Sequence, residues 1–139
     1  MHPILKERQG LALYLLGWAL VGILVAFAIA SETPGLWLDA LVLAVPITVL
    51  YAFVCLAAWY VCLANPVPGS SIVRVVGSQI VGSLLSSALL LLLGRAWAEL
   101  AGFLPGTGDA EALFTTNRPV CFAAGILLYR LAATLSYLL

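Results

Sequence analysis

Four long apolar stretches constrain this chain more than any other feature of its sequence. They cover residues 11–30, 38–64, 75–93 and 120–139. A bilayer core about 30 Å thick needs roughly 20 apolar residues in an α-helix. The stretches are continuous and rich in Leu and Ala, without the alternation of a membrane β-strand. The sequence therefore predicts an all-α integral membrane protein, a single domain built as a bundle of four transmembrane helices.

Composition excludes most other classes of protein. Of the 139 residues, 64% are hydrophobic and 9% are charged, whereas a soluble domain is about 45–50% apolar and about 25% charged. Six basic and six acidic residues cancel, so no net field attracts a nucleic acid. The three cysteines are well separated and fit neither a zinc knuckle nor a disulfide framework. We expect the lipid bilayer as partner, no nucleic acid, no metal and no catalytic residue in this chain.

Basic residues near the helix ends predict the orientation in the membrane. Lys6 and Arg8 precede the first stretch and Arg74 lies between the second and third, whereas the first connection carries Glu32 and Asp39. We therefore expect a multi-pass protein of the bacterial inner membrane with both termini in the cytoplasm. The last stretch stays apolar to its end without a basic anchor, which suggests a fragment whose remainder continues into the cytoplasm.

Proline and glycine indicate where the helices bend and end. Pro46 lies inside the second stretch and should kink it or end its first turn. Residues 65–71 form a cluster of helix breakers. Residues 104–108 match the LPxTG sorting motif, but they lie between two apolar stretches and lack a basic tail, so we interpret them as a Pro/Gly turn. Asp109 and Glu111 beyond this turn are interpreted as the N-terminal pair of a helix.

Arg130 is the residue whose insertion into a membrane costs most. It follows Pro119 by eleven residues and so lies near the middle of the bilayer, where a central Arg costs roughly 2.5–3.5 kcal/mol. Thr134 and Tyr137 fall on the same helix face. One interpretation is a contact to an anion or ligand, or a polar lock, facing the bundle or a partner. The other is snorkelling, or a helix that leaves the membrane earlier, and both stay open.

The second stretch carries small and polar residues at spacings of three and four, which place them on one helix face: Thr48, Tyr51, Cys55, Ala58 and Cys62. Cys55 and Cys62 lie about 10 Å apart along the axis, too far for a direct disulfide, and Cys121 in the fourth stretch can reach only one of them. Redox or metal sensing is one interpretation, and packing by small residues is the other. Tyr51 and, in the third stretch, Gln79 are further intramembrane polar candidates for a ligand contact.

Small residues four apart predict close contacts between helices. Gly22 and Ala26 form such a ridge in the first stretch, and Ser78, Gly82 and Ser86 form another in the third. In lipid these ridges let two backbones approach and form interhelical hydrogen bonds. They indicate close packing or dimerisation, with a polar cavity along the serines as the alternative.

Two segments carry a resemblance to a known family. Residues 1–5 followed by 11–18 (MHPIL and LALYLLGW), together with residues 50–62 (LYAFVCLAAWYVC), resemble the N-terminal membrane region of bacterial sensor histidine kinases of the LytS/YehU-like class. The resemblance implies a four-helix membrane part followed by a cytoplasmic linker helix, a dimerisation and phosphoacceptor segment, and an ATPase domain that binds ATP and Mg. It also implies a response regulator as partner.

This chain lacks the catalytic modules of that family and departs from it in the fourth helix. His2 is at the wrong end to be the phosphoacceptor, and Arg130 and Ser136 replace the apolar, histidine-containing pattern expected there. We therefore expect a membrane-embedded sensor and homodimerisation domain that transmits a signal through the fourth helix, without cofactor or enzymatic activity of its own. The alternative is a complete small four-helix transporter or channel. A membrane thiol protein is a third hypothesis.

Overall fold

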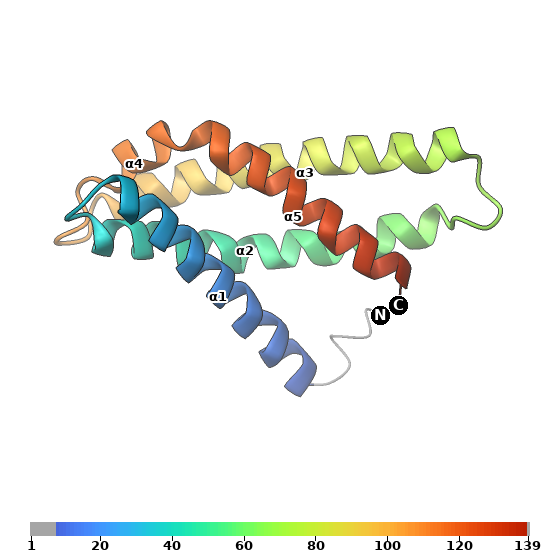
Figure 1. Cartoon of the computed structure of the whole chain (residues 1–139), viewed down its shortest axis with the longest axis horizontal. Coiled ribbons are helices and arrows are strands. Elements are labelled where there is room, and N and C mark those ends of the chain that lie inside the picture. Colours follow the sequence, from blue (N-terminus) through green and yellow to red (C-terminus); the bar gives the residue numbers. More distant parts are fainter. Residues whose placement is uncertain (1–7, 139) are drawn as a thin grey trace.

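The computed structural model describes residues 8–138, and these residues fold as helices joined by short turns, with no strand (Figure 1). Among residues 8–138, four helices are long and apolar enough to cross a membrane, which confirms the all-α prediction and fits a transmembrane bundle. Their bounds, with those of one short helix, are α1 Arg8–Glu32, α2 Trp37–Ala64, α3 Ile72–Ala101, α4 Ala110–Thr116 and α5 Arg118–Leu138. The N-terminal segment 1–5 with His2, the basic Lys6 and the terminal Leu139 lie outside the described residues.

The third helix extends further than its apolar stretch indicates. The apolar stretch covers residues 75–93 and is followed by Gly94 and Arg95, but α3 continues to Ala101. Gly94 is buried where the ring of Phe114 occupies the space that a side chain would need. Arg95 then donates a hydrogen bond to Glu99 one turn later, at 3.0 Å. Gly94 thus serves the contact with α4 and does not end the helix.

The connection between α3 and α5 folds against the start of α2. The Thr107 hydroxyl is buried and donates to the Ala101 carbonyl at 2.7 Å, and Gly106 has a positive φ of 86° that favours glycine. The buried carboxylate of Asp39 accepts a hydrogen bond from the Asp109 amide at 3.2 Å. These contacts confirm the interpretation of residues 104–108 as a turn. Asp109 lies at the N-cap position of the short α4 that follows, where its side chain makes no capping hydrogen bond.

α2 runs through the centre of the molecule and contacts the other three long helices. Figure 1 shows α2 and α3 antiparallel along the long axis, α5 crossing them obliquely, and α1 diverging from α2 toward Arg8. α3 and α5 pack against each other and against α2, whereas α1 makes its main contact with α2 alone. The arrangement is a three-helix core with a fourth helix attached to one side.

Pro46 lies inside α2 without ending it. Proline has no amide hydrogen, so the helical hydrogen bond to the carbonyl one turn earlier, that of Val42, is missing. The indole Nε1–H of Trp97 on α3 donates to this carbonyl at 2.7 Å. A side chain from the neighbouring helix therefore replaces the hydrogen bond that Pro46 removes. Such a replacement is needed because the lipid core offers no water to pair with a free backbone carbonyl.

Candidate functional site: an apolar cleft between α1 and α5

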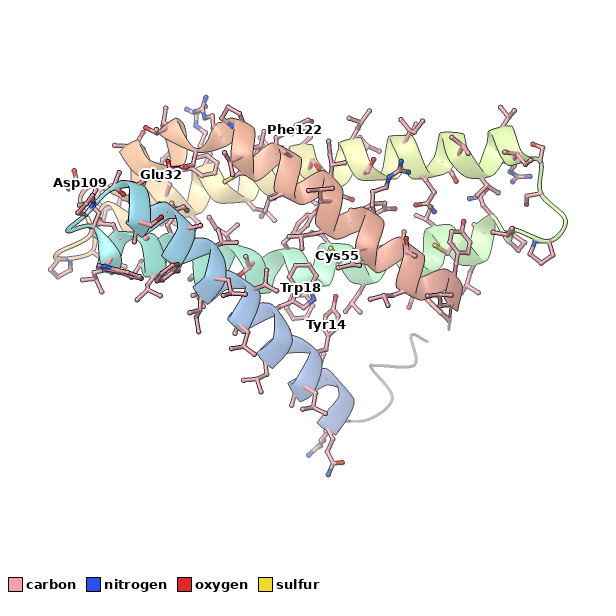
Figure 2. All side chains as sticks on the ribbon, in the orientation of Figure 1. Tyr14, Trp18, Glu32, Cys55, Asp109 and Phe122 are labelled. Atoms are coloured by element: carbon pink, nitrogen blue, oxygen red, sulfur yellow. The ribbon has the colours of Figure 1, made fainter. Side chains whose placement is uncertain are left out.

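α1 and α5 lie on the same side of α2 without closing on each other, and the space between them forms two adjoining cavities. The larger has a volume of about 510 Å³ and the smaller about 220 Å³, and Leu128 of α5 lines both. The walls of the larger cavity come from α1 through Tyr14 and Trp18 and from α5 through Leu131, while Cys55 of α2 lies at its floor. Figure 2 shows Tyr14, Trp18 and Cys55 close to one another where α1 diverges from α2.

Side-chain size along α1 explains this divergence. Near its C-terminal end, Gly22 and Ala26 are buried against α2, and a Cβ added to Gly22 would come within 2.8 Å of the Val45 Cα. Two turns earlier, the rings of Tyr14 and Trp18 stand between the helices instead. Small residues at one end and aromatic rings at the other set the two axes at an angle, and the cleft opens at the aromatic end.

The aromatic end of α1 is fixed by specific contacts to α2. The Tyr14 hydroxyl donates to the Ala52 carbonyl at 2.7 Å. Trp18 lies edge-to-face against both Tyr14 and Tyr51, with ring centroids 6.1 Å apart in each pair. α1 is therefore held away from α5 by a defined aromatic cluster.

α5 is held to α3 by close contacts at glycines. The Tyr129 side chain covers Gly82, where no Cβ would fit. A Cβ at Gly125 would come within 2.9 Å of both Ser87 and Leu90. Of the ridge predicted on α3, the structure thus places Gly82 in the contact with α5. Ser86 is also buried, while Ser78 is half-buried and donates to the Val75 carbonyl of its own helix at 2.8 Å.

Polar side chains join α2, α3 and α5 at the end near the 65–71 turn. The Gln79 amide donates to the Tyr137 hydroxyl at 3.3 Å and approaches the Cys62 sulfur at 3.6 Å. The Tyr137 hydroxyl in turn donates to the Asn65 carbonyl at 3.1 Å. This cluster brings the predicted Gln79 together with one of the three cysteines.

Deeper in the core, polar atoms are only partly paired. The Tyr51 hydroxyl donates to the Gly125 carbonyl at 2.7 Å, linking α2 to α5. Within the described part of the chain, the buried Oε1 of Gln79, the Ser87 hydroxyl and the Tyr129 hydroxyl have no hydrogen-bond partner. We call these three buried polar atoms, two on α3 and one on α5, the polar seam.

Arg130 and Thr134 lie on the outer face of α5 and are exposed. The Thr134 hydroxyl donates to the Arg130 carbonyl of its own helix at 2.8 Å, and the guanidinium has no partner among residues 8–138. The structure therefore places neither residue in the core or in the cleft. Of the interpretations of Arg130, contact with a partner, snorkelling and a helix that leaves the membrane earlier remain.

The three cysteines are free thiols in separate surroundings. Cys55 and Cys62 are buried on the expected face of α2, and the Cys62 thiol approaches the Ala133 carbonyl of α5 at 3.7 Å. Cys121 lines the smaller cavity. Among residues 8–138, no group of three His, Cys, Asp or Glu side chains could hold a metal ion. The surroundings of the three cysteines are those of residues that pack helices together.

The cleft itself was not predicted from the sequence, although Tyr14 and Trp18 are four residues apart, as required for one helix face. No known protein family, curated protein or solved structure matches the chain. Function is therefore argued from the geometry and from the resemblance of two of its segments.

Proposed function

We propose that this chain is the membrane-embedded input and dimerisation domain of a bacterial sensor histidine kinase, lying in the inner membrane with both ends toward the cytoplasm. One observation carries the proposal. The two described segments that resemble the family, 11–18 and 50–62, pack against each other through the Tyr14–Ala52 hydrogen bond and the Trp18–Tyr51 ring contact. The resemblance thus falls on one structural unit, which borders the cleft.

The proposed signal passes from this unit to α5. α2 contacts α1 through the aromatic cluster and contacts α5 through the hydrogen bond from Tyr51 to Gly125. A change in the cleft alters the spacing of α1 and α5, and α5 then moves relative to the core, as in other helix shifts between two discrete packings. The C-terminal end of α5 is the output, and the kinase part beyond it would bind ATP and Mg and phosphorylate a response regulator.

The test begins with the gene. A reading frame that continues past Leu139 into a linker helix, a phosphoacceptor segment and an ATPase domain is the expected result, and a frame that ends there contradicts the proposal. The full-length product in vesicles is then assayed for autophosphorylation. Tyr51→Phe, which removes the hydrogen bond from α2 to the Gly125 carbonyl of α5, should change its rate, while Leu127→Ala on the exposed face of α5 should not.

The polar seam favours a second candidate, a small transporter or channel. Among residues 8–138, buried polar atoms of Gln79 and Ser87 on α3 and of Tyr129 on α5 have no hydrogen-bond partner, and polar groups within a membrane often mark a pathway. Ion or solute flux into liposomes that is lost in Gln79→Leu, but retained in Arg130→Leu, would favour this function over the first. Absence of flux in the wild type would dismiss it.

A further inference from the structure

We infer that the cleft between α1 and α5 binds one acyl chain of a membrane phospholipid. The cleft lies along helices that are long enough to span a bilayer, so its open side faces hydrocarbon. Its walls are mainly leucine, isoleucine, valine, alanine and aromatic side chains, with Glu32, Thr48 and Asn117 as polar exceptions in the smaller cavity. This inference goes beyond the proposed kinase function and does not depend on it.

The few hydroxyl groups on the walls of the larger cavity are already paired. The Tyr14 hydroxyl donates to the Ala52 carbonyl at 2.7 Å, and the Ser136 hydroxyl donates to the Ala132 carbonyl at 2.8 Å. An occupant therefore meets hydrocarbon and ring faces, with no free donor or acceptor from these two groups. A polar ligand would lose its own hydrogen bonds there at a cost of several kcal/mol, whereas an acyl chain loses none.

The size of the cleft favours a chain over a helix. An α-helix with side chains is about 10–12 Å across and about 30 Å long when it spans a bilayer, which corresponds to well over 2,000 Å³ by the same dimensions. The two cavities have volumes of about 510 and 220 Å³. A helix of a second copy is thus too large to enter, while a single hydrocarbon chain is narrow enough.

The cleft does not close on itself, because α1 is fixed at two places. Gly22 packs against the backbone of α2 at one end, and Tyr14 and Trp18 stand against it at the other. Moving α1 onto α5 would break the Tyr14 hydrogen bond and the ring contacts. Leaving the cleft unfilled would forfeit the dispersion contacts of its walls. A mobile acyl chain from the bilayer restores these contacts without moving either helix.

The experiment fills the cleft from α1. A Cβ at Gly17 meets no atom within 4 Å, and Gly17 lines the larger cavity, so Gly17→Leu should fold and occupy the site. Gly77→Leu is the matched control, because Gly77 of α3 is equally unobstructed and does not line the cleft. Leu131→Phe on the opposite wall is a second filling variant, in case the first does not fold.

Two measurements are made on the purified full chain. Native mass spectrometry after detergent exchange should find one phospholipid retained per wild-type chain. Retention should be about tenfold lower in Gly17→Leu, equivalent to about 1.4 kcal/mol, because the leucine side chain takes up part of the larger cavity. In vesicles, phosphatidylcholine brominated on its acyl chains should quench the Trp18 fluorescence, isolated as the difference from Trp18→Phe. This quenching should fall in the filled variants and persist in Gly77→Leu.

Equal lipid retention in Gly17→Leu, Leu131→Phe and Gly77→Leu would overturn the inference, because the lipid would then be bound elsewhere. Loss of retention on detergent exchange in the wild type, together with unchanged Trp18 quenching in the filled variants, would also overturn it. Neither readout uses kinase activity. Failure of this inference is therefore distinct from failure of the proposed function.

Discussion

At the scale of single residues, the pairing of polar atoms decides what each side chain contributes, because lipid supplies no replacement partner. The Val42 carbonyl is a polar group whose partner comes from another helix. Pro46 leaves this carbonyl without a helical hydrogen bond, and the Trp97 indole donates to it, with 2.7 Å between Nε1 and the oxygen. Tyr129 illustrates the opposite case, a buried hydroxyl without a partner in the described chain. The two cases predict opposite responses to the removal of a polar group.

The first prediction concerns the Trp97–Val42 hydrogen bond. Trp97→Phe should destabilise the protein by about 1 kcal/mol, within the range of single hydrogen bonds in membrane proteins. Pro46→Ala restores an amide hydrogen to α2, so Trp97→Phe should cost clearly less in that background. The free energies of unfolding of the wild type, the two single variants and the double variant are measured in mixed micelles with increasing SDS. Trp37→Phe, at a tryptophan that is 46% exposed, is the control, and equal costs in both backgrounds would contradict the prediction.

The second prediction compares two buried tyrosines. Tyr51→Phe should destabilise the protein by about 0.6–1.7 kcal/mol, because it removes the hydrogen bond to Gly125. Tyr129→Phe should be neutral or stabilising, since it removes a buried hydroxyl that has no partner among residues 8–138. The same unfolding assay checks both variants. A larger loss for Tyr129→Phe than for Tyr51→Phe would indicate that the Tyr129 hydroxyl has a partner in the membrane.

At the scale of helices, the number of spans was predictable, whereas helix lengths and buried faces were predictable only in part. The four spans follow from the number of consecutive apolar residues, and the bounds of α2 agree with the expected residues 38–64 to within one position. The buried face was predictable where small or polar residues mark it. The face of α2 with Thr48, Tyr51, Cys55, Ala58 and Cys62 is buried, as are Gly22 and Ala26 of α1. Elsewhere the outer face in lipid is as apolar as the inner one. For Arg130 the sequence left the face open, and the structure places it on the outer face of α5.

The remaining features of the fold depend on contacts between distant residues. Gly94 ends no helix because Phe114, far along the chain, occupies the space beside it. The cleft depends on which residues of α1 meet which residues of α2, namely Gly22 with Val45 and Tyr14 with Ala52. Spacing within one segment predicts the small ridge or the aromatic pair separately. It does not predict the angle that they produce together.

The third prediction tests that angle at the level of the α1–α2 contact. Gly22→Ala should destabilise the protein by about 1–3 kcal/mol, because its Cβ would lie within 2.8 Å of the Val45 backbone and force the helices apart. Gly17→Ala is the matched control on the same helix, where a Cβ meets nothing within 4 Å. SDS unfolding measures stability, and Trp18 emission reports the α1–α2 contact. Equal effects of the two substitutions would contradict the tight contact at Gly22.

At the scale of the whole molecule, an even number of spans places the start of α1 and the end of α5 on one side of the bilayer. Two internal contacts define the sides. Asp39 binds Asp109, so the turns 33–36 and 102–109 lie together, and Tyr137 binds Asn65, so the end of α5 lies beside the 65–71 turn. Topology thus reduces to one question, namely which of these two ends faces the cytoplasm.

Charge predicts the answer, and cysteine labelling can measure it. In the sequence, Lys6 and Arg8 come before or at the start of α1 and Arg74 follows the 65–71 turn, whereas the opposite end carries Arg95 and Arg118. The positive-inside rule, which counts basic residues, therefore favours the 65–71 turn as cytoplasmic. In a background with the three native cysteines replaced by alanine, Val67→Cys, at a side chain 59% exposed, should react with a membrane-impermeant maleimide in inverted vesicles and not in intact cells. Gly108→Cys, where a Cβ meets no atom within 4 Å, should show the reverse pattern. Labelling of Val67→Cys from outside would invert the topology and direct α5 away from the cytoplasm, which is incompatible with α5 as the output of a cytoplasmic kinase.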